Sequence, residues 1–145
     1  MPKTRYASKT SVPAERSQRE IEQVLRKYGA DAFAYAWQSD KAVIVFEFHN
    51  RRMRFTLPLP VEPERETATR ANERRAEIRR LWRALALSIK AKVVAVSDNI
   101  ATVEQEFMGH IVLPNGETVA EWLEPQLERI YNERRMPPLL EGPRE

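Results

Sequence analysis

The sequence contains no cysteine, and it has only four glycines and two histidines among 145 residues. A chain without cysteine can form neither disulfides nor thiolate metal sites. With so few glycines, it also has no glycine-rich loop of the kind that binds phosphate groups. No stretch holds the roughly 20 apolar residues that a transmembrane helix needs, and the first residues lack the apolar core of a secretory signal. These absences predict a cytoplasmic protein that does not enter a membrane.

Residues with catalytic chemistry are also few. Glu47 and His49, with two arginines nearby, could in principle perform acid-base chemistry, but pairing at the end of a hairpin explains these residues better. Glu106 and His110 are spaced to share one helical face, yet two ligands do not make a metal site. The sequence has no recognisable nucleophile motif. We therefore predict a protein that is not an enzyme and that holds neither a cofactor nor a metal ion.

What the sequence does contain is an uneven distribution of charge. The formal net charge is +3 overall, but residues 1–97 sum to +9 and residues 98–145 to −6. Arginine outnumbers lysine 18 to 6, which suits bidentate binding of phosphate, although GC-rich coding would give the same excess. A polyanion would be attracted to one part of such a molecule and repelled by the other. Any contact with nucleic acid should therefore be one-sided.

The first part of the chain predicts a flexible basic arm and a short helix. Residues 1–12 are polar and show no period, so we interpret them as the arm. Ser17 and Glu20 have the spacing of a capping box. The apolar residues that follow recur at i, i+3, i+4 and i+7 before a glycine stop at Gly29; they are Ile21, Val24, Leu25 and Tyr28.

Three segments then alternate apolar and polar side chains, which predicts an antiparallel meander. Two-residue turns at Ser39-Asp40 and Asn50-Arg51 would fix its register. The opposed pairs are then Tyr35–Ile44, Phe33–Phe46, Phe48–Met53, Phe46–Phe55, Ile44–Leu57, Glu47–Arg54 and His49–Arg52. Because this register sets every large apolar residue against another, it places the aromatic side chains, Trp37 included, on one buried face.

The rest of the chain predicts helices and a tail. Prolines mark a linker at 58–69, and an amphipathic helix covers 70–96. Capping boxes at Thr102–Gln105 and Thr118–Glu121 begin two shorter helices, and residues 133–145 form a proline-rich tail. The predicted fold is a single α+β domain over residues 13–132, in which one long and two shorter helices pack on the aromatic face of the sheet and bury Trp82.

Two surfaces are candidates for binding. The outer sheet face is small and flat, and it could serve as a partner or homodimer surface; its residues are Ala34, Ala36, Val43, Val45 and Thr56. The second candidate is a set of cations. In the predicted register Arg51 and Arg52 lack an acidic partner, whereas Arg75, Arg79 and Arg83 recur along about 12 Å of one helix edge, a spacing that can follow phosphates. Lys3, Arg5 and Lys9 of the arm would assist them.

The chain also resembles a family of small uncharacterised proteins encoded by phages and prophages. The resemblance is carried by "TSVPAERSQREIEQVLRKYGA", "LPLP", "LWRALALSIKAKVVAV" and "EFMGHIVLPNGETVAEWLEPQL". It implies a role in handling DNA or in redirecting a machine of the host cell, and it brings no assigned site. The order helix, three strands, helix is also similar to the double-stranded RNA-binding domain, but that module needs a lysine cluster at the start of its second helix, which this sequence lacks.

Two functions remain open at this point. The first is a nucleic-acid-binding accessory protein of phage or mobile-element DNA metabolism, with phosphate contacts that are largely independent of sequence. The second is a protein-binding inhibitor or adaptor that acts on a host enzyme. In this case the acidic last third, with Glu117, Glu121, Glu124 and Glu128, could occupy a site that normally accepts nucleic acid.

Overall fold

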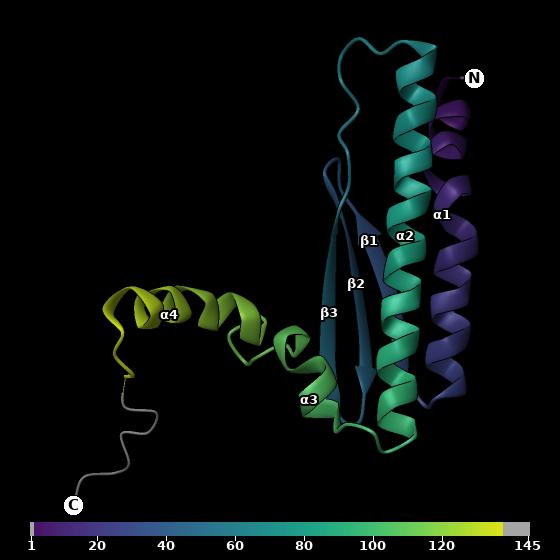
Figure 1. Cartoon of the computed structure of the whole chain (residues 1–145). Coiled ribbons are helices and arrows are strands. Elements are labelled where there is room, and N and C mark those ends of the chain that lie inside the picture. Colours follow the sequence, from purple (N-terminus) through teal and green to yellow (C-terminus); the bar gives the residue numbers. More distant parts are fainter. Residues whose placement is uncertain (1, 138–145) are drawn as a thin grey trace, which may run out of the picture.

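The computed structural model describes residues 2–137, with side chains from residue 14 onward. It has the predicted α+β class and order of elements (Figure 1). The elements are α1 (Pro2–Lys27), β1 (Ala32–Trp37), β2 (Lys41–Phe48), β3 (Arg51–Pro58), α2 (Ala68–Ser97), α3 (Val103–Phe107), the 3-10 turn η1 (Met108–His110) and α4 (Val119–Glu133).

Helix α1 is longer than the sequence predicted. It already includes residues 2–12, for which we expected a flexible arm, and it runs through Ser17, which is buried inside the helix and does not cap it. The predicted end is correct. Gly29 has a φ of +91° and donates its N–H to the Arg26 carbonyl, while Ala30 donates to Leu25. These two bonds form a Schellman motif, in which glycine supplies the left-handed conformation.

The first hairpin has the predicted register, with Phe33 opposite Phe46 and Tyr35 opposite Ile44. The second hairpin is shifted by two residues, because its turn is formed by His49 and Asn50. Both residues have a positive φ (51° and 62°), as a type I′ turn requires.

The shift changes the partners but not the faces, because side chains alternate with a period of two. Glu47 therefore lies opposite Arg52 instead of Arg54, and His49 sits in the turn instead of opposite Arg52. Phe46 and Phe55 are not directly opposed, yet they share the inner face, where their rings stack with centroids 5.8 Å apart.

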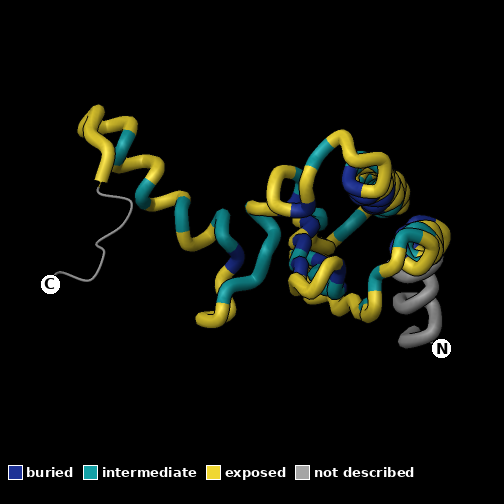
Figure 2. Tube along the Cα trace, turned by 90° about the horizontal axis from the view of Figure 1, so that it is seen from below, coloured by how far each residue is buried: buried dark blue, intermediate teal, exposed yellow. Residues whose placement is uncertain are grey.

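The core lies between this inner face and the helices. Helices α1 and α2 lie side by side on the same side of the sheet, and seen from below the buried residues gather where they meet it (Figures 1 and 2). Trp82 of α2 is buried as predicted. Phe107 of α3 closes the lower end, with its ring edge-on to Phe46 and Phe55 at centroid distances of 6.1 and 6.2 Å.

The caps explain where the later helices begin. The Thr67 side chain accepts a hydrogen bond from the Arg70 N–H and starts α2, and Thr102 with Gln105 forms the complete capping box predicted for α3. Thr118 caps α4 in the predicted place. Satisfying the free N–H groups at a helix start is worth about 1 kcal/mol for each cap.

Helix α4 is the one element whose position differs from the prediction. It does not cover the aromatic face of the sheet but extends away from the body (Figure 1). The short segment before it adds to the free edge of β3, where Val112 donates its N–H to the Arg52 carbonyl and Ile111 bridges Met53. The body is thus two layers of sheet and helices, and α4 projects from the side of β3.

Candidate interaction surfaces

The arginines near the β2–β3 turn all have acidic partners in the structure. Arg51 lies 3.8 Å from Glu104, and Arg52 lies 3.3 Å from Glu47. The prediction that both lack an acidic partner is therefore wrong. For Arg52 the reason is the shifted turn, which places it opposite Glu47. Such exposed pairs contribute little stability, but they neutralise charge that a phosphate would otherwise meet.

Arg54 has a different role from the sheet pairing that was predicted. Its side chain bonds to the Glu121 carboxylate at 2.7 Å and to the Gly116 carbonyl at 2.9 Å. The bond from Arg54 holds the pKa of Glu121 below its usual value. Arg54 thus fixes the first turn of α4 against the outer side of β3.

On α2, the three predicted phosphate ligands are not equivalent. Arg79 and Arg83 are exposed, and no acidic side chain in the described part of the chain lies within ion-pair distance of either. Arg75 is only partly exposed and donates to Asn72. Arg80, between them, is paired with Glu77 at 2.6 Å. Two of the three cations therefore remain available.

The structure does not bring the two predicted cation clusters together. Arg79 and Arg83 lie near the middle of α2, whereas the β2–β3 turn with Arg51 and Arg52 lies at the end of the body opposite the linker (Figure 1). The side chains of Lys3, Arg5 and Lys9 lie outside the described ones. A single continuous phosphate-binding surface is thus not formed by the residues that the structure describes.

The linker is held by a buried ion pair that the sequence did not indicate. The Arg74 side chain is 8% exposed and donates two hydrogen bonds, of 2.8 and 3.0 Å, to the Glu66 carboxylate, which is 10% exposed. Glu62 lies 3.8 Å from the same guanidinium. A charged side chain on a helix is ordinarily solvated, so Arg74 alone gave no signal. Only Arg74 considered together with the two linker carboxylates of Glu62 and Glu66 could have suggested this pair.

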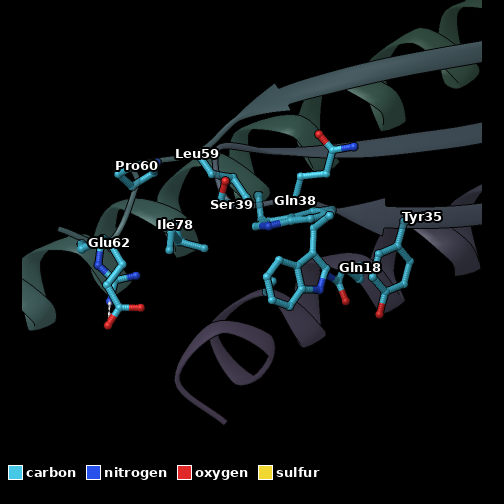
Figure 3. Close-up of a pocket in the computed structure, with 12 residues that line it drawn as sticks. Gln18, Tyr35, Gln38, Ser39, Leu59, Pro60, Glu62 and Ile78 are labelled. Carbon is cyan, nitrogen blue, oxygen red and sulfur yellow. Dashed lines mark ion pairs between the residues drawn. The ribbon is translucent and has the colours of Figure 1, made fainter. Parts of the chain in front are cut away.

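Beside this ion pair is a pocket lined by aromatic side chains. Tyr35 and Trp37 of β1 form part of its wall, and both remain about half-exposed, at 46% and 45%. Trp37 was predicted to be core and is not. Gln18 and Tyr35 lie at one end of the pocket and Glu62 at the other (Figure 3). The inward-facing aromatic residues at this end of β1 are incompletely covered because α1 offers only small or polar side chains here, Ala14 and Gln18.

The outer sheet face is uncovered among the described residues. Ala34, Ala36 and Thr56 are exposed, and Val43 and Val45 are partly exposed. Both α1 and α2 lie on the other side of the sheet (Figure 2). This patch has the flat, small-residue surface that the sequence predicted.

Helix α4 presents the largest exposed apolar side chains of the second half of the chain. None of its residues is buried, and Trp122, Leu127 and Tyr131 are exposed. Leu123, Leu127, Ile130 and Tyr131 follow the spacing i, i+4, i+7 and i+8, which gathers them on one helical face. Glu124 and Glu128 are exposed without an ion pair in the described part of the chain. The helix therefore combines an apolar stripe with acidic flanks.

His110 is half-buried against Phe55, and their rings stack with centroids 3.8 Å apart. Burial, together with the nearby Lys92 ammonium, lowers the pKa of His110 below its usual value. Across residues 14–137, no three His, Asp or Glu side chains are grouped so that they could hold a metal ion.

Comparison of the chain with models of protein families, with curated proteins and with solved structures found no match. The resemblance to phage-encoded proteins stays a prediction from the residues. Between residues 2 and 137, no helix is both long enough and apolar enough to cross a membrane.

Proposed function

We propose that this chain is a non-enzymatic protein-binding module, an adaptor or inhibitor of another protein, and that α4 is the element that docks. The observation that carries the proposal is the position of α4. It leaves the body with Trp122, Leu127 and Tyr131 exposed, although aromatic and large aliphatic side chains are the ones that contribute most when a surface is buried.

The spacing of the apolar residues suggests how α4 binds. An amphipathic helix that lies in a groove contacts its partner with residues at i, i+3 or i+4 and i+7. The exposed carboxylates of Glu124 and Glu128 would then meet the rim of the groove. The partner that fits is an apolar groove with basic edges, and a channel that normally accepts nucleic acid has such edges.

The outer sheet face supports the same proposal from a second direction. Arg54 fixes the start of α4 on the side of this face, so a partner that grips α4 can also reach Val43 and Val45. A flat apolar patch next to a protruding helix would enlarge the buried area toward that of a stable interface.

The proposal is tested by capture of a partner with a tagged chain. The double variant Leu127→Ser/Tyr131→Ser should lose the partner that the wild-type chain retains, because it removes two exposed apolar anchors without altering the core. The matched control is Asn132→Ala, which changes an exposed polar residue of the same helix. Equal recovery of the partner by all three chains would contradict the role of α4.

The chemistry of the groove has its own test. If the partner normally accepts nucleic acid, an oligonucleotide should compete with the chain for it, and Glu124→Lys/Glu128→Lys should weaken capture more at low salt than at high salt. Nuclease treatment before capture should leave the complex intact. A complex that disappears on nuclease treatment would show that nucleic acid bridges the two proteins.

A second candidate function is sequence-independent nucleic-acid binding in phage or mobile-element DNA metabolism. It is favoured by Arg79 and Arg83, which are exposed and have no acidic neighbour within ion-pair distance among the described residues. A titration of single- and double-stranded oligonucleotides at two salt concentrations tests it. Affinity should fall by about one log unit per log unit of salt for each phosphate neutralised.

The control for this titration removes a paired arginine of the same helix. Arg79→Ala/Arg83→Ala should reduce both the affinity and its salt dependence, whereas Arg80→Ala should change both less, because Arg80 is already paired with Glu77. Absence of binding at low salt would remove nucleic acid from consideration.

A further inference from the structure

Strand β1 forms one edge of the sheet, since the order of strands is β1-β2-β3. Its sequence is AFAYAW, and every residue except Phe33 is exposed. The other edge of the sheet is different. Along β3, Val112 bonds to the outward-facing carbonyl of Arg52 and Ile111 bridges Met53. Among the described residues, part of one edge is therefore covered and the other edge is open.

The backbone groups of β1 that face outward can be identified from the ladder. Gln38 donates its N–H to the Lys41 carbonyl at 2.8 Å, and in an antiparallel pair such bonded positions alternate along the strand. The even-numbered residues of β1 thus bond to β2. Phe33, Tyr35 and Trp37 point their N–H and C=O groups out of the sheet, and no described residue bonds to these groups.

Edges of this kind are ordinarily protected. Proteins place charged side chains, prolines or bulges on an edge strand, or cover it, so that it does not pair with another chain. Strand β1 carries none of these devices between Ala32 and Trp37, and its pairing with β2 is continuous. In addition, the inward-facing rings of Tyr35 and Trp37 remain about half-exposed beside this edge.

We propose that β1 pairs antiparallel with β1 of a second copy of this chain across a two-fold axis at Tyr35. The two three-stranded sheets then form one continuous sheet. The opposed pairs would be Tyr35 with Tyr35, Phe33 with Trp37, and Ala34 with Ala36. This inference goes beyond the proposed function, because it concerns a different surface and a different partner.

The register follows from the strand itself. Opposed residues of an antiparallel pair point to the same face, so inward residues must meet inward residues. A two-fold axis at Tyr35 meets this condition and sets aromatic rings against aromatic rings and alanines against alanines. In this register Phe33 lies opposite Trp37, and Tyr35 lies opposite Tyr35 of the second copy. The N–H and C=O groups of these residues all point out of the β1 edge. Each opposed pair can therefore exchange two hydrogen bonds.

The second copy fits better than an unrelated strand because this arrangement is self-complementary. Strand β1 has no charged residue between Ala32 and Trp37, so antiparallel pairing sets no like charges opposite each other. The exposed ring of Trp37 would be covered by Phe33 of the second copy. Aromatic cross-strand pairs are among the most stabilising contacts that neighbouring strands make.

Light scattering over a range of protein concentrations tests the proposal. We expect the wild-type mass to approach that of a dimer as concentration rises. Ala34→Lys/Ala36→Lys should weaken the dimer by about tenfold or more, because each lysine would face a lysine of the other copy. Both positions are exposed on the outer face, so the fold of the single chain is unaffected. A wild-type chain that stays monomeric at all concentrations would overturn the proposal.

Two further chains make the test specific. Ala34→Glu/Ala36→Glu should also be monomeric alone, but mixed with the lysine variant it should restore a dimer of one chain of each kind. Thr56→Lys, on the same face but far from the β1 edge, should leave the dimer unchanged. Loss of the dimer in Thr56→Lys, or no recovery in the mixture, would assign the contact to the outer sheet face and overturn the edge pairing.

Hydrogen exchange gives an independent result. The N–H groups of Phe33, Tyr35 and Trp37 should exchange slowly in the dimer and rapidly in the lysine variant, while those of Ala34 and Ala36 remain protected in both. These variants leave α4 untouched. A lysine variant that no longer dimerises but still captures a partner would show that the β1 edge and α4 act independently. An α4 variant that dimerises but captures no partner would show the same.

Discussion

Arg74 lies on the buried face of α2, together with Ile78 and Trp82, which follow it one and two helical turns later. A buried guanidinium is costly unless its charge and its N–H groups are satisfied. Glu66 satisfies Arg74 with a bidentate contact from the linker. One side chain thus ties a proline-rich connection, which has little structure of its own, to the helix that it precedes.

Arg74→Ala should therefore be among the most destabilising single changes in the chain. It leaves the Glu66 carboxylate buried without this cation, and we expect the free energy of unfolding to fall by about 3–5 kcal/mol. Urea unfolding measures this change. Arg80→Ala, which breaks an exposed pair with Glu77, is the control and should lower the free energy of unfolding far less, because solvent screens exposed pairs. Similar losses for the two variants would contradict the buried character of the Arg74 pair.

His110 should make stability depend on pH. Because its pKa is lowered by burial and by Lys92, the unfolded chain binds a proton more readily than the folded one. The stability that neutral His110 contributes is fully present above the usual histidine pKa of about 6.5. It is lost as the pH falls from there through the lowered pKa of the folded chain. The difference in urea midpoint between wild type and His110→Gln should shrink over this range. A difference that does not change with pH would show that His110 titrates alike in both states.

At the scale of elements, the hairpins show what a pattern of residues determines and what it does not. The alternation of Phe46, Phe48, Met53 and Phe55 predicts the buried face correctly whichever two-residue turn is chosen. It cannot distinguish registers that differ by two residues, since the faces are identical in both. The choice depends on the turn, where His49 and Asn50 accept a positive φ and the predicted Asn50-Arg51 pair is not used.

The turn predicts opposite effects of two substitutions at one position. Asn50 has a φ of 62°, so Asn50→Gly should be neutral or slightly stabilising, whereas Asn50→Val should cost roughly 1–3 kcal/mol because a β-branched residue is strained there. Thermal unfolding of both variants measures this. If valine were tolerated as well as glycine, the turn would have to lie elsewhere.

The helices also show which features local sequence determines and which depend on the rest of the fold. Thr102 and Thr118 could be identified as caps because the signal is local. Ser17 carries the same local signal but lies inside α1, where continuation of the helix from Pro2 overrides it. Trp37 has the alternation of a core residue, yet it is half-exposed, because its burial depends on which residues of α1 face it.

At the scale of the whole molecule, the charge asymmetry read from the sequence does not become a single cationic face among the side chains that the structure describes. The arginines are divided between the β2–β3 turn, where Glu47 and Glu104 pair with them, and the exposed side of α2. The placement of α4 away from the body could not be predicted either. An apolar stripe indicates that a helix face is to be covered, but not whether the cover is its own domain or another molecule.

A chain that ends at Gly116 should therefore still fold. It lacks α4, which has no buried residue, and the buried cap Thr118. It also loses the Arg54–Glu121 contact and the backbone bonds from Val119 to Ile111 and from Leu113 to Glu117. We expect a cooperative unfolding transition whose free energy is lower by no more than about 2 kcal/mol. Circular dichroism with urea measures it. A chain that no longer unfolds cooperatively would mean that α4 belongs to the folding unit of the body.

The unequal edges of the sheet set a limit on assembly. Residues 111 and 112 occupy the margin of β3, so only β1 can accept an added strand along its full length. Once the two β1 strands have paired, the combined sheet has no open β1 edge left. Because the proposed two-fold pairing uses the β1 edge of both copies, it closes at two molecules and leaves no β1 edge from which a filament could grow.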